Sequence, residues 1–326
     1  MHGVDSLLVE SAGAVTLPYR ETRKLALEAG SHPRGLSFLS AASGLVRVHD
    51  KLYVIADDER HLGVFSIDGE EPLKLLRLLD GDLPASAKKR KKLKPDFESL
   101  LVLPATDASP GGSLLALGSG SRSNRFVGAL AGLDPRGNVV GPARPIDLKP
   151  LYADIFERFA QLNIEGAFVT GESLMLLQRG KGVGESAAIR YELAEVVAWL
   201  AGRRPGALRA WSVRSVDLGA ASGVAFAFTD GAALSDGSWV FSAVAEDRDD
   251  SYVDGPCVAA AIGVCGSDDV VSSLELLEPT RKVEGIEARV VGTTAFLTLV
   301  TDADDPDHPA ELGTTRVELR GPMSSR

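Results

Sequence analysis

The stretch Val283-Glu284-Gly285-Ile286 contains a short pattern that recurs along the chain: an apolar residue, an acid, a small residue and another apolar residue. Two further copies keep the acid, Phe97-Glu98-Ser99-Leu100 and Ile164-Glu165-Gly166-Ala167. Two weaker copies carry serine instead, Ser43-Gly44-Leu45 and Ser222-Gly223-Val224. Each copy opens an apolar run, and successive copies are about 60 residues apart, a spacing that indicates one structural unit repeated around an axis.

Each unit contains short apolar segments separated by turn residues. In the first unit these segments are 45–48, 52–56, 62–67 and 73–79. Four such strands form an antiparallel sheet of the kind used as a propeller blade. The last unit supplies only three strands, and the unpaired apolar segment around Leu25 could complete it, which would remove an open sheet edge. The sequence therefore predicts an all-β, single-domain β-propeller over residues 1–326, with its ring closed by an N-terminal strand.

Five blades are favoured over six. The interval that runs from Glu284 around the chain ends to Ser43 is longer than the others, but a sixth blade would need residues 5–19, which contain only one convincing apolar stretch. Two segments between strands depart from the strand pattern. Residues 150–162 have apolar positions near helical spacing and residues 192–206 also look helical, so we expect helical insertions there.

The composition excludes several classes of protein. A net charge of −10 argues against a general nucleic-acid binder, because duplex affinity depends on neutralising phosphates with cations. No apolar run approaches the roughly 18 to 20 residues of a membrane span, and the first residues do not resemble a secretory signal. We therefore expect a cytoplasmic protein with neither nucleic acid nor membrane as a partner. Cys257 and Cys265 are expected to be free thiols.

Acidic residues are expected to gather at one end of the ring. In a propeller the inner strand of each blade begins at the face where the loop between its second and third strands lies, so the repeated residues should meet the residues that follow each second strand. Oxygen ligands without a cluster of Cys or His favour a hard cation, Ca²⁺ before Mg²⁺. The alternative is that these acids bind backbone amides and brace the blades. The predicted metal ligands are Glu98, Glu165, Glu284, Asp57, Glu246 and Asp302.

Other polar residues are predicted at the same rim. Arg122 and Arg179 are candidates for binding an anionic small molecule, together with Ser43 and Ser222, which replace the acid in two units. The lysine-rich segment 88–94 directly precedes Glu98 and could attract the same ligand, although a solvated loop is the simpler interpretation. A purely structural repeat has no evident reason to alternate between Glu and Ser, so the alternation favours an asymmetric binding site.

The repeated segments also resemble a known family. Ser43-Gly44-Leu45 followed by 53–58, and the segments 96–100, 163–167 and 282–286, are similar to the phytase-like (esterase-like) β-propeller proteins of bacteria, closest to an uncharacterised branch of that group. The resemblance covers roughly residues 40–305. It implies a Ca²⁺-associated propeller whose relatives include phosphomonoesterases, and it assigns no catalytic residue to this chain.

Together these features predict a propeller that binds Ca²⁺ and an anionic small molecule at the channel mouth. In its enzymatic form it would be a metal-dependent hydrolase of phosphate esters. Two alternatives stay open at this point: a non-catalytic interaction propeller whose channel acids are structural, and a hydrolase of lactones.

Overall fold

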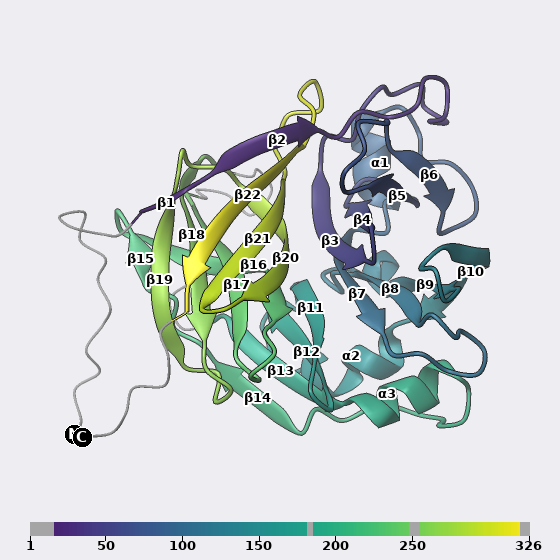
Figure 1. Cartoon of the computed structure of the whole chain (residues 1–326). Coiled ribbons are helices and arrows are strands. Elements are labelled where there is room, and N and C mark those ends of the chain that lie inside the picture. Colours follow the sequence, from purple (N-terminus) through teal and green to yellow (C-terminus); the bar gives the residue numbers. More distant parts are fainter. Residues whose placement is uncertain (1–15, 181–184, 248–254, 320–326) are drawn as a thin grey trace.

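The computed structural model describes residues 16–180, 185–247 and 255–319. Five sheets, antiparallel apart from one short parallel edge strand, follow one another along the chain. Their inner strands contact each other in cyclic order, with the last against the first (Figure 1). The predicted five-bladed β-propeller is therefore confirmed, and the described residues contain no sixth sheet. None of the described helices is long and apolar enough to span a bilayer.

The first three blades each contain four strands in chain order. Blade I consists of β3 (Ala42–Val48), β4 (Lys51–Ala56), β5 (His61–Ser66) and β6 (Lys74–Arg77). Blade II consists of β7 (Phe97–Leu103), β8 (Ser113–Gly118), β9 (Val127–Leu133) and β10 (Val139–Asp147). Blade III consists of β11 (Ile164–Thr170), β12 (Ser173–Gln178), β13 (Ala187–Glu192) and β14 (Ser212–Ser215).

The last two blades include strands from the N-terminal region. Blade IV consists of β16 (Val224–Ala233), β17 (Trp239–Glu246), β18 (Cys257–Cys265) and β19 (Val271–Glu278), extended by β15 (Ala220–Ala221) and β1 (Thr16–Pro18). Blade V consists of β20 (Val283–Val291), β21 (Thr294–Thr301), β22 (Glu311–Glu318) and β2 (Arg20–Lys24). The helices α1 (Ala87–Leu93), α2 (Lys149–Phe156) and α3 (Leu193–Leu200) lie between blades or between strands.

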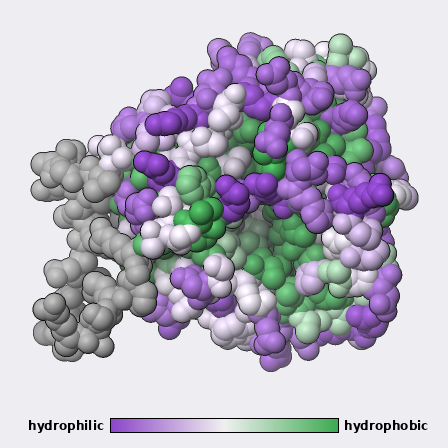
Figure 2. Space-filling model, in the orientation of Figure 1, coloured by the Kyte–Doolittle hydropathy of each residue, from purple (hydrophilic) through white to green (hydrophobic). Residues whose placement is uncertain are grey.

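The N-terminal closure is confirmed, but its strand lies earlier in the chain than the sequence suggested. Strand β2 pairs antiparallel with β22, whereas the apolar segment around Leu25 continues into blade I through isolated bridges, among them Leu27 with Leu73. Leu25 and Leu27 are buried between blades V and I, where removing their apolar surface from water stabilises the fold. The closing strand β2 is the outermost strand of its blade and faces solvent, and Figure 2 shows hydrophilic side chains over it. The prediction chose the apolar segment around Leu25 because it assumed that the closing strand would be hydrophobic.

The hydrophobic core is divided among the five contacts between neighbouring blades. Each contact has its own cluster of buried side chains: blades II and III share one that includes Tyr152 of α2, and blades III and IV share one around Trp239. The other three clusters lie between blades IV and V, V and I, and I and II. Because side chains of a strand alternate between its two faces, each blade can contribute to both adjacent clusters.

Candidate functional site at the channel mouth

The recurring sequence pattern corresponds to a β-bulge at the start of the inner strand. Ser43, Glu98, Glu165 and Glu284 each occupy the extra position where the register between the first two strands of a blade shifts. A bulge leaves one residue unpaired and redirects its side chain. The repeated pattern therefore identifies the bulge residues, whose side chains are redirected at one end of the channel.

Blade IV follows the same rule at a different residue. Its bulge falls at Thr229, between Phe228 and Asp230, and not at Ser222. Ser222 and Gly223 form the two-residue turn between β15 and β16, and both have positive φ, 50° and 81°. Hairpin turns with positive φ favour small residues such as glycine. The sequence Ser222-Gly223-Val224 therefore matched the repeated pattern although it forms a turn. Ser222 is exposed and does not join the other predicted residues.

The residues that follow the second strands lie beside the bulges, as the alignment of the units indicated. The backbone amides of Asp57, Ser119, Arg179 and Asp302 donate hydrogen bonds to the carbonyls two residues before the bulge in their own blades. In blade IV the second strand runs further, to Glu246. The structure thus brings all six predicted metal ligands to one mouth of the channel, although they form two groups.

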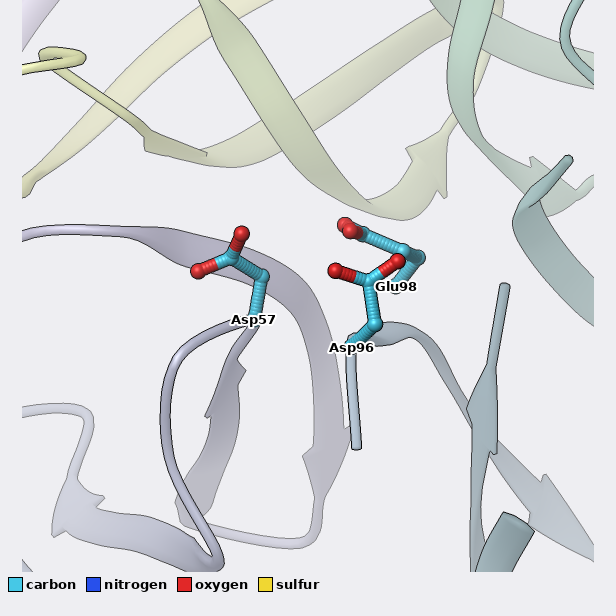
Figure 3. Close-up of side chains that lie close together, drawn as sticks. All are labelled: Asp57, Asp96 and Glu98. Atoms are coloured by element: carbon cyan, nitrogen blue, oxygen red, sulfur yellow. The ribbon is translucent and has the colours of Figure 1, made fainter. Parts of the chain in front are cut away.

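The first group consists of Asp57, Asp96 and Glu98. One carboxylate oxygen from each lies within 4.8 Å of the others, and no other set of three such ligands within this distance occurs in the described part of the chain. Figure 3 shows Asp57 after β4 facing Asp96 and Glu98 at the start of β7. Asp96 was not among the predicted ligands, and the sequence signal that points to it is its position two residues before Glu98; in the structure it has a left-handed φ of 58°.

Cations already neutralise part of this group. The Lys94 ammonium contacts Asp57 and lies 2.9 Å from Asp96 Oδ1, and Arg125 Nη1 lies 2.7 Å from Asp96 Oδ2. Ser119 Oγ donates a further hydrogen bond of 2.6 Å to Asp96 Oδ2. A metal ion bound by these carboxylates would therefore compete with Lys94 for the same oxygens.

The second group lies across the mouth, between blades III and V. Arg179 bridges Glu165 and Glu246, with nitrogen–oxygen distances of 3.1 and 2.6 Å. Lys282 lies 3.1 Å from Glu246 and 3.4 Å from Glu284. The same ammonium is 2.6 Å from Asp304 Oδ1 and 3.9 Å from Asp302 Oδ2. Arg179 is thus bound by carboxylates and is not aimed at an external anion.

Negative charge remains in excess at the mouth. Burial raises the pKa of Asp57 to about 6, of Asp302 to about 7 and of Glu284 to about 8, and neighbouring carboxylates add to each rise, while a nearby lysine opposes it. Burial and the neighbouring carboxylates also raise the pKa of Glu98 well above its usual range. The acids that meet here outnumber Lys94, Arg125, Arg179 and Lys282; they are Asp57, Asp96, Glu98, Glu165, Glu246, Glu284, Asp302 and Asp304. Crowded, partly dehydrated carboxylates of this kind are relieved by protonation or by a bound cation.

The predicted anion-binding residues are placed differently from one another. Arg122 is exposed at the start of a short 3-10 helix, and the arginine that reaches the mouth from this turn is Arg125. Segment 88–94 forms most of helix α1, which has no buried residue. Its Arg90 pairs with Asp58, and Lys94 directly follows the helix and enters the mouth.

Ser43 is buried and ties two blades together, because its hydroxyl donates a hydrogen bond to the carbonyl of Phe97 in blade II. We expect Ser43→Ala to lower the free energy of unfolding by about 1 kcal/mol through loss of this bond. Chemical denaturation would measure the change. If Ser43 instead binds a ligand, its replacement should weaken ligand binding and leave stability unchanged.

Two cavities open beside the mouth. The larger, about 930 Å³, is lined on the blade III side by Asn163 and Arg179 and on the blade IV side by Val244 and Glu246. The smaller, about 400 Å³, lies between blades IV and V and includes Lys282 and Asp302. Both volumes are within the range of about 300–1,000 Å³ that is typical of small-molecule sites.

Comparisons with known proteins identify a family for this chain. Residues 38–317 match the model of a family described as "Family of unknown function (DUF6929)". No curated protein matches the chain. Similar solved structures include a luciferin-regenerating enzyme, with 8% identity, 92% of this chain and 95% of that chain covered, and a TM-score of 0.49.

Two further solved structures have lower TM-scores. A hypothetical protein from Leishmania major has 11% identity, 92% and 90% coverage and a TM-score of 0.46. The β-propeller domain of Cps50 (Swd1) from Myceliophteria thermophila has 11% identity, 85% and 72% coverage and a TM-score of 0.38. At such low identity these likenesses concern the fold alone, and the narrower resemblance to phytase-like proteins stays a prediction.

Proposed function

Because the chain belongs to the family of unknown function DUF6929, which supplies no activity, we propose its function from the chemistry of the channel mouth. In this proposal the protein binds a divalent cation, Ca²⁺ foremost, through Asp57, Asp96 and Glu98, and an anionic small molecule beside it. In its enzymatic form it is a metal-assisted phosphoesterase. The cytoplasmic location stays a prediction from the sequence.

The observation that carries the proposal is the convergence of the three carboxylates within 4.8 Å of one another. Their donors are all oxygen atoms, which suits Ca²⁺ better than a softer metal. Burial, together with repulsion from Asp96, Glu165 and Asp57, raises the pKa of Glu98 well above its usual range. A divalent cation would relieve this repulsion more effectively than the single ammonium of Lys94.

The proposed roles of the surrounding residues follow from their contacts. A bound Ca²⁺ would supply positive charge that polarises a phosphoryl group. Arg125 holds Asp96 in place, and Arg179 holds Glu165 and Glu246 back from the ligand. The larger cavity offers room for the organic part of the substrate next to Asn163 and Arg179.

A non-catalytic interaction propeller is the competing candidate, and a specific observation favours it. Lys94 and Lys282 already act as counter-charges within the mouth, each in contact with carboxylates from two neighbouring elements. In that case the acids and lysines brace the blades and no metal is needed.

We expect Ca²⁺ to bind the wild-type protein and to raise its melting temperature. At a free concentration 100 times the Kd, one bound ion adds about 2.7 kcal/mol to the free energy of unfolding. Titration calorimetry and thermal unfolding, with Mg²⁺ in parallel, would measure this. Absence of both heat and thermal shift would favour the interaction propeller.

A screen of phosphate esters and lactones tests the enzymatic form separately, and no turnover with any of them would overturn it.

A further inference from the structure

The ammonium of Lys94 lies among the carboxylates of the mouth site. It contacts Asp57 and lies 2.9 Å from Asp96 Oδ1, and one oxygen from each of these acids lies within 4.8 Å of the third acid, Glu98. The Lys94 side chain is only 12% exposed. A lysine of the protein itself thus provides the positive charge that a bound metal ion would provide among these oxygens.

The charges around Lys94 determine which ions can replace it. The described ion pairs give the three acids two cationic partners, Lys94 and Arg125, so one negative charge is left over. Exchange of the ammonium for Na⁺ or K⁺ leaves this excess unchanged, because both ions carry a single charge. Exchange for a divalent cation removes the excess, and the gain is larger where water is partly excluded. Displacement of Lys94 therefore favours a divalent ion over a monovalent one.

Helix α1, which directly precedes Lys94, has little stability of its own. It has seven residues, no buried residue, no side-chain hydrogen bond at its N-cap and no acid in its first turn. Lys88 and Lys92 are four residues apart, and like charges at this spacing destabilise a helix. An isolated helix shorter than about 12–15 residues is marginal in water. Helix α1 therefore depends on contacts with the rest of the protein.

Contacts in the second half of α1 and at Lys94 hold the helix to the blades. Arg90 Nε lies 2.9 Å from Asp58 Oδ2, and Arg60 Nη2 lies 3.5 Å from the carbonyl that precedes Lys94. Asn124 Nδ2 donates a hydrogen bond of 3.0 Å to the Lys94 carbonyl, and the Lys94 ammonium adds its contacts with the acids. Loss of the ammonium contacts would therefore loosen the C-terminal end of the helix.

We propose that Lys94 determines the ion selectivity of the mouth site. Its ammonium takes the place of the cation in the metal-free protein, a divalent ion displaces it, a monovalent ion does not, and the displacement releases α1 from the mouth. This rests on the proposed function, because it requires that Asp57, Asp96 and Glu98 bind a cation. It adds a residue that selects the ion and a helix that responds to it.

Lys94→Met is expected to bind Ca²⁺ at least about tenfold more tightly than the wild type, because no ammonium has to be displaced. Titration calorimetry would measure both affinities. At a constant ionic strength of about 0.1 M, replacing tetramethylammonium chloride by NaCl should weaken Ca²⁺ binding to Lys94→Met and leave the wild type unchanged. Equal or weaker Ca²⁺ binding in the variant, or the same response to Na⁺ in both proteins, would overturn the role of Lys94.

Lys282→Met is the matched control, because Lys282 is another buried lysine of the mouth but pairs with acids of the second group. Its affinity for Ca²⁺ should change by less than about threefold, since the lost charge lies outside the three ligands. Equal tightening in both variants would mean that net charge, and not occupation of the site by Lys94, determines affinity. Absence of Ca²⁺ binding in both the wild type and Lys94→Met would overturn the proposed function, and the role of Lys94 with it.

Hydrogen exchange measured by mass spectrometry tests the release of α1 in the wild type alone, and so covers the case in which Lys94→Met does not fold. In the helix the Arg90 amide donates to the Ser86 carbonyl and the Lys94 amide to the Arg90 carbonyl, each at 2.8 Å. Saturating Ca²⁺ should accelerate exchange over residues 87–94, whereas ion binding normally slows exchange by stabilising the folded state. Unchanged or slower exchange there would overturn the release of α1.

Discussion

The double variant Asp57→Asn, Glu98→Gln is expected to bind Ca²⁺ at the mouth at least about 100-fold more weakly than the wild type, a loss of roughly 2.7 kcal/mol. The two substitutions keep the shape of both side chains but remove two of the three charges that converge there. Loss of these charges also weakens the hold on Lys94, which then has only Asp96 among the three acids. Titration calorimetry would measure the affinity.

Asp107 and Glu157 supply a matched control, since both are exposed and lie in loops apart from the mouth ligands. Asp107→Asn, Glu157→Gln makes the same change in net charge and should leave Ca²⁺ affinity within about twofold, because exposed charges at a distance are screened by salt. Equal affinities in the two double variants would contradict the assignment of Asp57 and Glu98 as ligands.

Arg179→Met is expected to lower the free energy of unfolding by about 3–5 kcal/mol in the absence of metal ions. Arg179 is only 8% exposed and binds Glu165 and Glu246, so its removal leaves two buried carboxylates without their counter-charge. Chemical denaturation with a chelator present would measure the change. If a cation can take over as counter-charge, added Ca²⁺ should recover part of the lost stability.

Arg122→Met is the control for this variant, because Arg122 was an equally good candidate in the sequence but is exposed. We expect its effect to stay within about 0.5 kcal/mol, as for most surface substitutions. A loss as large as that of Arg179→Met would mean that the general removal of positive charge, and not the buried ion pairs, determines stability.

The architecture was predictable because four of the five repeated residues, Ser43, Glu98, Glu165 and Glu284, occupy bulges, and each is followed by a small residue. The register of blade IV was not predictable in the same way. Asp230 stands one residue after the bulge, so its acid falls out of phase with Glu165 and Glu284. The sequence at Ser222 matched the repeated pattern more closely than the sequence around Asp230, but Ser222 lies in a hairpin turn with positive φ and not at a bulge.

The composition of the mouth was only partly predictable. The six acids converge because the fold brings inner and second strands to one face, which a pattern of strands can reveal. That Lys94 and Lys282 enter the same space depends on side-chain rotamers and on the end of a short helix. Likewise Arg125, and not Arg122, reaches Asp96, a difference of three residues within a single turn.

Electron density at the channel mouth of a crystal grown with Ca²⁺ tests the central claim most directly. The account predicts an ion bound to carboxylate oxygens of Asp57, Asp96 and Glu98 at about 2.3–2.6 Å, with the Lys94 ammonium displaced from between Asp57 and Asp96. Lys94 still in contact with both carboxylates, and no ion among the three acids at saturating Ca²⁺, would contradict it.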